Sequence, residues 1–589
     1  MRLCLLALSI ATLTAQVPGE AEKAAQAIKI LDGWNAIAPR KETRSLHFVL
    51  WTPNDRKPPA NYEARLTRMM EHIQEFYAKE MKRLGFGPRS INLPYSKPGQ
   101  LKIHLIEGNH PNSHYGRPSG SEIRKECLPA LKKAGIDADR ETIVLFCNLA
   151  TWDEKKLIFK HNSPYYAGGN FQRGTAWQLD SPELDPKNIP LKKPMIQDGE
   201  YGRISLGKHN SIFIGGVCHE LGHALGLPHC RERPDEAARG TALMGSGNRS
   251  YGDELRGEGK GSFLTLAHAL RLASHPQFSG STKEFNSPSS AEIKELSISA
   301  EGKAIEVSGS VVANPPVYAV VAYFDPEGGS DYNATTATAI PDTNGNFTLS
   351  CDALPAGKSG ELRLIPLHVN GSTNGWMSQT KFKYPYTVSK DGTPDLSTFQ
   401  IKKSLAPLIE ALNTKRIDKA RKISSALKNP RAAKIAKILL SQNDAKGPIS
   451  QSTQLVALTR LTPTSEKVGW GRPSYDTLPG PSPLLESGSK IFATGIYAHA
   501  PSLHQYKLNK KWSKLEGTVG LAAGKSGSVR FEVKGDGKSL WRSPVIKEGQ
   551  LKTFSLNIKT IMSLELITET TPDGAASDWG LWLEPTLKR

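Results

Sequence analysis

Three histidines, one glutamate and two glycines lie together in the stretch His219-Glu220-Leu221-Gly222-His223-Ala224-Leu225-Gly226-Leu227-Pro228-His229. Side chains four residues apart lie one turn above each other on a helix, so His219 and His223 would present their imidazoles to the same point. Gly226 adopts a positive φ without steric cost, which would end the helix and let the chain turn back to bring His229 to that point. Three protein ligands leave a fourth position for water, as in catalytic zinc sites. The stretch therefore predicts one catalytic Zn²⁺ ion held by the three histidines.

Glu220 follows the first of these histidines directly. From that position its carboxylate would point toward the metal-bound water rather than the metal, and would take the proton of that water as it attacks a carbonyl. The alternative is a buried helix with ordinary core histidines. That alternative gives no packing reason for three converging imidazoles beside a glutamate. We therefore predict that Glu220 is the catalytic base.

The same residues resemble the zinc-binding consensus of the metzincin clan of zinc endopeptidases. In that clan the consensus is followed by a turn that contains a methionine and lies beneath the metal. Thr241-Ala242-Leu243-Met244-Gly245 resembles that turn, so the resemblance implies that Met244 forms the floor of the site. Some members add a tyrosine two residues after the methionine, a position occupied here by Ser246. Tyr251 is close enough in sequence to be a candidate for stabilising the oxyanion instead.

Strand and helix patterns alternate around this motif. Strands are predicted at 45–51, 101–106, 142–147 and 174–179, and helices at 62–84 and 212–225. Such alternation indicates a sheet with helices packed on it, in agreement with the α/β zincin fold that the resemblance implies. We expect this metzincin-like catalytic domain to span residues 16–283.

Residues 1–15 have the charge, the apolar run and the small-residue end of a signal peptide, although a buried N-terminal helix is the alternative. We expect the protein to be exported by a bacterium and to be secreted, periplasmic or held at the cell surface. No later stretch is long and apolar enough to span a membrane. Five cysteines remain after the leader, and the sequence leaves open one bridge, Cys127 to Cys147 or Cys218 to Cys230, or buried thiols throughout.

The middle of the chain predicts two further domains. A segment rich in Ser, Pro and Gly near residues 280–289 suggests a boundary. Short strand-like runs separated by turns then predict an Ig-like β-sandwich at 290–388. Residues 395–445 predict a helical connector, which Pro430 would break into two helices. Its basic surface could bind a membrane, but its apolar stripe favours packing on a neighbouring domain.

The last domain, predicted at 452–589, consists of short strands with Gly-rich turns and many aromatic residues. The segments Val468–Gly471, Ala493–Ser502 and Phe531–Lys538 resemble the carbohydrate-binding module known as NPCBM, a galactose-binding-like β-sandwich. Sugar sites stack a ring on an aromatic side chain and fix its hydroxyl groups with polar groups. The candidate sugar-binding residues are Tyr497, His499 and Trp579, for which packing in the core or at its rim is the alternative.

The formal net charge of +19 predicts attraction to polyanions. No nucleic-acid-binding motif is present, so sialylated or sulfated glycans are the expected partners. The sequence allows a structural Ca²⁺ ion but has no specific motif for one, and it leaves the oligomeric state open. An endopeptidase joined to a sugar-binding module resembles bacterial mucinases and O-glycopeptidases. We therefore expect cleavage of mucin-like O-glycoproteins beside glycosylated Ser or Thr.

The sequence leaves two alternative functions open. The first is a peptidase of broad specificity that its module merely tethers to glycans. The second is a non-catalytic adhesin that retains a zinc fold. The presence of Glu220 argues against the adhesin, because binding needs no general base.

Overall fold

The computed structural model describes residues 19–328, 331–373, 380–442 and 447–589. The leader predicted at residues 1–15 lies outside them. The described residues form two compact units. The first extends from the first described residues to Leu354 and includes Leu362–Lys383, and the second comprises Pro355–Glu361 with Tyr384–Arg589. Within the described part of the chain, no helix combines the length and the apolar character needed to cross a membrane.

A five-stranded sheet forms the framework of the first unit, with the strand order β4-β1-β5-β9-β8. Its strands are Ile103–Glu107 (β4), His47–Thr52 (β1), Thr142–Cys147 (β5), Gly174–Leu179 (β9) and Tyr166–Gly169 (β8). All neighbours pair in parallel except β8, which runs antiparallel to β9 at the edge of the sheet. The strands predicted within this sheet are confirmed, while the short edge strand β8 was not predicted.

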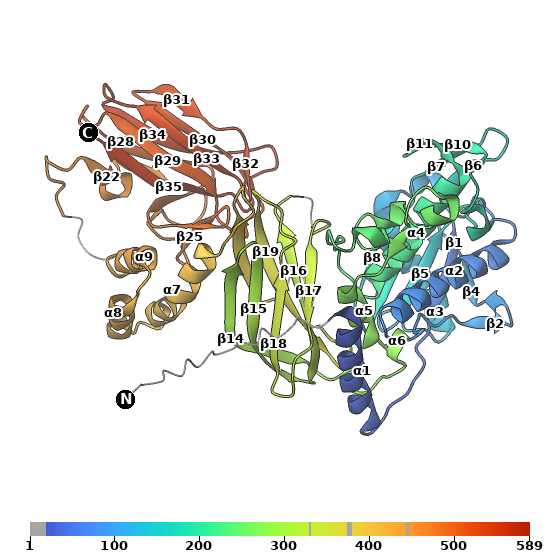
Figure 1. Ribbon diagram of the computed structural model, residues 1–589. Helices are drawn as coiled ribbons and strands as arrows, with labels where there is room; N and C mark the ends of the chain where they lie inside the picture. The colour runs from blue at the N-terminus through green and yellow to red at the C-terminus, as the bar shows by residue number, and fades with distance from the viewer. Residues whose placement is uncertain (1–18, 329–330, 374–379, 443–446) are drawn as a thin grey trace, which may run out of the picture. The chain divides into compact units, whose positions relative to one another are not determined.

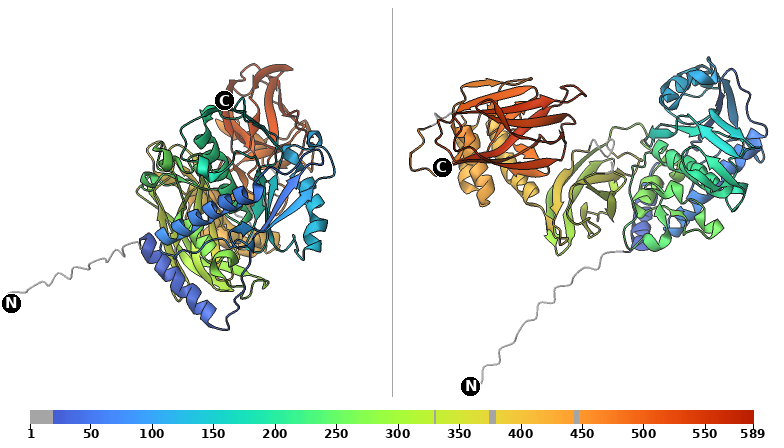
Figure 2. Two further views of the ribbon diagram at one scale, coloured as in Figure 1. Left: turned by 90° about the vertical axis from the view of Figure 1, so that its right-hand side faces the viewer. Right: turned by 90° about the horizontal axis from the view of Figure 1, so that it is seen from above.

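Helices cover both faces of this sheet (Figures 1 and 2). Phe48 and Leu50 of β1 belong to one buried cluster with residues of helices α2 (Tyr62–Arg83) and α4 (Leu206–Ala224). Val49 and Trp51, which alternate with them, belong to a second cluster with residues of helix α3 (Gly120–Lys133). Because successive strand residues point to opposite faces, this partition places α2 and α4 on one face of the sheet and α3 on the other.

Smaller elements complete this part of the first unit. Helix α1 precedes the sheet, a second, four-stranded sheet has the order β11-β10-β7-β6, and two short helices follow the histidine stretch. Their bounds are Glu20–Ala36 (α1), Tyr95–Lys97 (β2), Gln100–Leu101 (β3), Ala150–Asp153 (β6), Ile158–His161 (β7), Met195–Asp198 (β10), Gly202–Ser205 (β11), Thr241–Ala242 (β12), Ser262–Phe263 (β13), Leu266–Ala273 (α5) and Pro276–Ser279 (α6).

Strands that follow residue 289 form the rest of the first unit. A three-stranded sheet has the order β14-β15-β18, and β16 pairs with β17 in a second sheet. The bounds are Ser290–Glu301 (β14), Ala304–Asn314 (β15), Val317–Pro326 (β16), Thr335–Ala339 (β17), Asn346–Cys351 (β18) and Ser359–His368 (β19). Tyr318 of β16 is fully buried, and its hydroxyl donates a hydrogen bond to the carbonyl of Leu270 in α5. Strand β16 therefore shares one core with α5, a helix that follows the histidine stretch in the sequence.

The second unit contains helices α7 (Ser397–Asn413), α8 (Ile417–Ala426) and α9 (Pro430–Leu440), so the prediction of two helices is wrong. Pro430 begins α9 as expected. The missed break lies between α7 and α8, where Lys415 has a φ of 58°. A lysine rarely adopts this left-handed conformation, and nothing in the composition of the segment points to it.

Two facing sheets of short strands end the second unit. Their orders are β24-β27-β35-β29-β33, with β22 added to β35, and β23-β28-β34-β30-β31, with β32 added to β30. The bounds of their strands are Leu455–Ala457 (β22), Ser465–Lys467 (β23), Ser474–Tyr475 (β24), Gly495–His499 (β27), Ser502–Lys507 (β28), Lys514–Leu521 (β29), Ser528–Gly535 (β30), Lys538–Arg542 (β31), Ile546–Lys547 (β32), Leu551–Asn557 (β33), Ser563–Thr570 (β34) and Trp579–Lys588 (β35). Four more strands lie outside these two sheets: Lys383–Val388 (β20), Pro394–Asp395 (β21), Leu485–Ser487 (β25) and Lys490–Phe492 (β26).

The five cysteines of the described residues are all free and buried. Of the alternatives left open by the sequence, the structure therefore has buried thiols and neither of the two bridges. Cys218 lies on α4 with its side chain fully buried, as expected for a packing role.

Candidate functional site

Helix α4 presents the first two histidines. The hydroxyl of Ser205 caps its N-terminus by accepting a hydrogen bond from the backbone N–H of Lys208. At the other end, the N–H groups of Gly226 and Leu227 bond to the carbonyls of His223 and Gly222, which is the Schellman pattern of helix termination. Gly226 has a φ of 86°, as predicted. Arg271 of α5 donates a hydrogen bond of 2.8 Å to its carbonyl and fixes the reversal of the chain.

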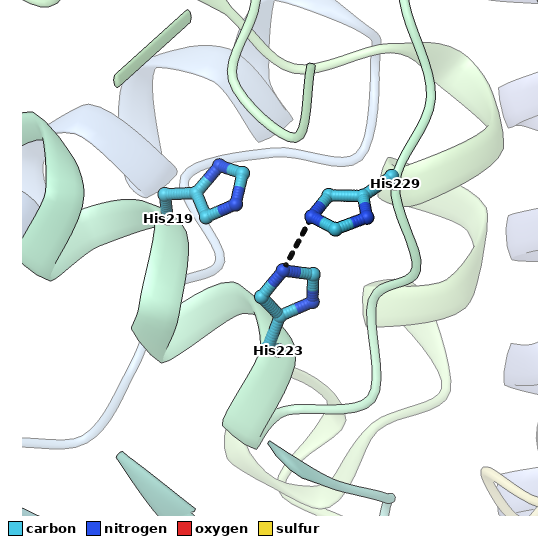
Figure 3. Close-up of side chains that lie close together, drawn as sticks. All are labelled: His219, His223 and His229. Atoms are coloured by element: carbon cyan, nitrogen blue, oxygen red, sulfur yellow. Dashed lines mark hydrogen bonds between the residues drawn. The ribbon is translucent and has the colours of Figure 1, made fainter. Parts of the chain in front are cut away.

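The three histidines converge as their spacing predicts (Figure 3). One ligand nitrogen from each of His219, His223 and His229 lies within 4.8 Å of the other two. The Nε2 atoms of His223 and His229 are 3.0 Å apart. The helix supplies the first two rings and the reversed segment supplies the third, so the same local geometry that ends α4 assembles the cluster.

Each ring is oriented through its other nitrogen. The Nδ1 atoms of His219, His223 and His229 lie 2.7 Å from the carbonyl oxygen of Leu243, 2.7 Å from that of Leu227 and 2.8 Å from Oδ1 of Asp331. An oxygen acceptor needs a proton on Nδ1, which leaves Nε2 of a neutral ring with a lone pair. All three lone pairs are thereby available at one point, and this pattern is typical of metal-binding histidines.

The electrostatics of the cluster favour a metal cation over protons. Burial and the neighbouring imidazoles lower the pKa of His219 to about 3. Burial and His229 lower the pKa of His223 to about 4. The 3.0 Å contact between Nε2 of His223 and Nε2 of His229 requires either a proton shared by the two nitrogens or a cation bound between them. Three neutral nitrogen donors fit Zn²⁺, so the residues present fit the ion that the spacing predicts.

Glu220 follows His219 on α4, and its carboxyl contacts Ala167 of strand β8. Burial raises the pKa of its carboxyl to about 8, against the opposite effect of a hydrogen bond from the backbone N–H of Ala167. Both influences act on the pKa of Glu220 in the protein without a bound cation. A divalent ion nearby would favour the ionised form of this carboxyl group. The position is suited to a group that exchanges a proton with water at the cluster.

Met244 packs beneath α4. A Cβ atom at Gly222 would lie 2.6 Å from its Sδ atom, so the helix carries a glycine where the sulfur approaches it. The residue before the methionine, Leu243, supplies the carbonyl that orients His219. The turn thus supports the cluster from below, which fits the floor role suggested for Met244.

Tyr251 does not lie at the cluster, and its suggested oxyanion role is not supported. Its ring packs against His72 and Phe76 of α2, and its hydroxyl is fully enclosed. A Cβ atom at Gly215 would lie 2.5 Å from the Cβ of Tyr251, which places this tyrosine against the N-terminal half of α4. Tyr251 is close to Met244 in the sequence, but between the two residues the chain turns to another face of α4. The sequence did not show this turn.

Two residues of the turn between β16 and β17 reach the cluster, and the sequence did not reveal them. The Asp331 carboxylate contacts His229, and the Tyr332 ring stacks on His229 at 3.5 Å between centroids and 25° between planes. Burial and the carboxylates of Glu220 and Asp331 raise the pKa of Tyr332. Burial opposes ionisation of Asp331, but the hydrogen bond and charge of His229 outweigh it and lower its pKa. About a hundred residues separate these positions from His229, so no local pattern reveals them.

A second candidate site lies in the last sandwich. The structure brings the predicted residues Tyr497, His499 and Trp579 together, since the rings of Tyr497 and Trp579 are 5.1 Å apart and those of Tyr497 and His499 are 6.4 Å apart. Tyr497 and His499 are buried, and Lys525 covers Trp579 at 3.9 Å. Trp470, 5.3 Å from Trp579, is 55% exposed. It is the ring of this cluster best placed to stack on a sugar.

Replacing Trp470 with Ala is therefore expected to weaken glycan binding by about 10-fold or more, because a carbohydrate would lose its stacking surface. Glycan-array binding or calorimetry with mucin glycans measures the effect. The matched control is Trp541→Ala, a tryptophan of β31 outside the cluster. Equal losses in both variants would contradict a specific role for Trp470.

The described residues contain one further group with metal-ligand chemistry, His110, His114 and Glu122. Neither this group nor the histidine cluster consists of the all-oxygen ligands that Ca²⁺ prefers. The structural Ca²⁺ ion allowed by the sequence thus gains no support from clustered acidic side chains in the described segments.

Comparison with known proteins identifies the last domain. Residues 454–588 match the family model of the NPCBM/NEW2 domain, so the C-terminal sandwich is an NPCBM module, as the sequence resemblance implied. A curated relative from Renibacterium salmoninarum, described as "Putative endo-alpha-N-acetylgalactosaminidase", is 32% identical over 122 residues, which is 19% of this chain. The chain spans only 8% of the length of that relative.

Solved structures of OgpA from Akkermansia muciniphila are also similar to the chain. The wild-type structure has a TM-score of 0.49 and 25% sequence identity, and the match covers 61% of this chain and 98% of that one. A catalytically inactive OgpA in complex with an O-glycopeptide substrate, glycodrosocin, has a TM-score of 0.47 and 26% identity, with 57% and 94% covered.

Proposed function

We propose that this chain is a zinc endopeptidase of the metzincin type that cleaves O-glycosylated proteins. One observation carries the proposal: the Nδ1 atoms of His219, His223 and His229 are all held by oxygen acceptors, ligand nitrogens of the three rings converge, and Glu220 directly follows the first of these histidines on α4. A packing role explains neither the convergence nor the adjacent carboxyl group. The proposal includes the catalytic, sandwich, connector and NPCBM domains with the boundaries predicted from sequence, and export through the leader.

The chemistry follows from what surrounds the cluster. A bound zinc ion would acidify a water molecule and polarise the substrate carbonyl. Glu220 would take the proton from the attacking water and deliver it to the leaving amine. Tyr332, exposed beside His229 and influenced by Glu220, is the best candidate among the described residues for donating a hydrogen bond to the developing oxyanion. It takes over the role first suggested for Tyr251.

Strand β8 offers a binding mode for the peptide. It is an edge strand of the five-stranded sheet, and its residue Ala167 contacts the Glu220 carboxyl. An extended peptide can add to such an edge through main-chain hydrogen bonds, which would carry a scissile bond past the cluster. A surface groove lined by Tyr166, Ala167, Gly168, Arg124 and Arg173 runs along the same strand.

Three features support a glycosylated substrate. The chain ends in an NPCBM module with an exposed tryptophan, Trp470, beside its candidate residues. A curated relative that matches 19% of the chain is described as "Putative endo-alpha-N-acetylgalactosaminidase". The net charge of +19 would attract sialylated or sulfated chains. We therefore propose mucin-like O-glycoproteins as substrates, with cleavage beside a glycosylated Ser or Thr.

The test uses matched peptides that differ only in one N-acetylgalactosamine on Thr. We expect kcat/KM for the glycopeptide to exceed that of the bare peptide by at least about 100-fold, because a site built for sugar hydroxyl groups leaves them unmatched without the sugar. Mass spectrometry of the products gives the cleavage position. Equal cleavage of both peptides would favour the tethered peptidase of broad specificity, and zinc binding without cleavage of either would favour the adhesin.

A further inference from the structure

A second group of ligating side chains lies at the other end of the five-stranded sheet from β8. His110 and His114 belong to the segment that follows β4, and Glu122 lies in the first turn of α3. One ligand atom of each lies within 4.8 Å of the others, the same span that contains the three nitrogens of the catalytic cluster. Nε2 of His114 is 2.9 Å from Oε1 of Glu122. The ring centroids of His110 and His114 are 4.1 Å apart.

The backbone under this group is held firmly. The hydroxyl of Tyr115 accepts a hydrogen bond from the backbone N–H of His110 and donates one of 2.8 Å to Glu126. The Glu126 carboxylate also accepts a hydrogen bond of 2.9 Å from the indole of Trp51 in β1. The carbonyl of His110 accepts a hydrogen bond from the N–H of Asn54. These contacts hold the backbone of His110, and the N–H of His114 donates a hydrogen bond of 3.0 Å to the carbonyl of Pro111. Side-chain rotations therefore separate the observed arrangement from a ligand set.

We propose that His110, His114 and Glu122 form a second binding site for a divalent transition-metal ion, Zn²⁺ in the first instance. An ion pair between His114 and Glu122 would need no second imidazole, yet the ring of His110 lies 4.1 Å from that of His114, and one of its nitrogens lies within 4.8 Å of both ligand atoms of the pair. One shared cation satisfies all three groups. Two imidazoles and one carboxylate suit Zn²⁺, Co²⁺ or Ni²⁺ and do not suit Ca²⁺ or Mg²⁺.

The geometry also indicates what this ion would do. Zinc donors at about 2.0–2.1 Å from the metal lie roughly 3.3 Å from one another. On binding, His114 and Glu122, now 2.9 Å apart, would separate slightly, and the ligand atom of His110 would move in from its present distance of at most 4.8 Å. Closure would tie the 3-10 turn Asn112–His114 to the start of α3. Because the side chains of His114 and Glu122 are each 43% exposed, we expect weaker binding than at the buried catalytic cluster. The site is therefore structural, with water completing the coordination, and acts independently of the proposed peptidase chemistry.

The experiment titrates the metal-stripped full-length protein with Zn²⁺ in competition with a chromophoric chelator. We expect two equivalents for the wild-type chain, a tight one and a weaker one. The double variant His110→Ala/His114→Ala should lose the weaker equivalent and keep the tight one. Conversely, the double variant His219→Ala/His223→Ala should lose the tight one and keep the weaker one. The control is His104→Ala, a partly exposed histidine of β4 outside the group, which should bind as the wild type does.

A second variant guards against misfolding of the first. Glu122→Gln keeps the size of the side chain and removes its charge, so it should weaken the second equivalent by about 10-fold or more without changing the circular dichroism spectrum. With Co²⁺ as the probe, the wild type should show a second visible absorption component that both variants of this group lack. A wild-type chain that binds one equivalent, or a double variant that still binds two, overturns the proposal. Failure of the peptidase assay would leave either result unaffected.

Discussion

Replacing Glu220 with Gln is expected to lower kcat by about 10²–10⁴-fold, the usual contribution of a positioned general base. The amide keeps the size of the side chain but cannot accept the proton of the attacking water. Zinc content should stay at the wild-type value, because the expected ligand atoms are nitrogens of the three histidines and the Glu220 carboxyl is not among them. Initial rates on an O-glycopeptide and elemental analysis of the same preparation measure both quantities.

The matched control for this variant is Glu75→Gln on the exposed side of α2, which should retain wild-type rates. An unchanged rate in the Glu220 variant would assign the base to another residue. A loss of zinc together with activity would show that the carboxyl group supports metal binding rather than proton transfer.

Replacing Asp331 with Ala is expected to weaken zinc binding by about 10–100-fold, the usual effect of removing the partner of a ligand imidazole. The Asp331 carboxylate holds Nδ1 of His229 at 2.8 Å and so fixes which nitrogen of that ring faces the cluster. Without it, His229 would rotate or take the other tautomer. Competition titration with a zinc chelator measures the affinity without any substrate.

Asp352→Ala is the control for this second variant, because Asp352 directly follows β18, has a side chain that is 70% exposed and pairs with Arg233 rather than with a histidine of the cluster. Its zinc affinity should equal that of the wild type. If Asp331→Ala also binds zinc as the wild type does, the sandwich strands do not help to form the metal site, and His229 is oriented by its own segment alone.

The histidine cluster could be predicted because its geometry is local. The four-residue step of a helix aligns His219 with His223, and a glycine that tolerates a φ of 86° turns the chain back to His229. The parallel strands could be predicted for a similar reason, since β1 and β5 are continuous apolar runs buried on both faces. In both cases a short segment contains the whole physical cause of its structure.

The remaining features depend on residues that are far apart. Asp331 and Tyr332 follow β16, and they reach the cluster only because β16 shares a core with α5. The buried Tyr318 of β16 makes this contact through its hydrogen bond to Leu270. No pattern near His229 indicates such a partner. Tyr251 shows the opposite error, since closeness in sequence suggested a role that its packing against α2 excludes. For Trp470, exposure was the deciding property, and the sequence does not give it.

The most direct measurement is an anomalous difference map from crystals of the full-length protein, recorded on both sides of the zinc absorption edge. A strong peak should lie about 2.0–2.1 Å from Nε2 of His219, His223 and His229, and should keep its height in the Glu220→Gln variant. A weaker peak between His110, His114 and Glu122 would belong to the separate second site. The account would be contradicted if active protein gave no peak among the three histidines, or if their rings were found to point apart.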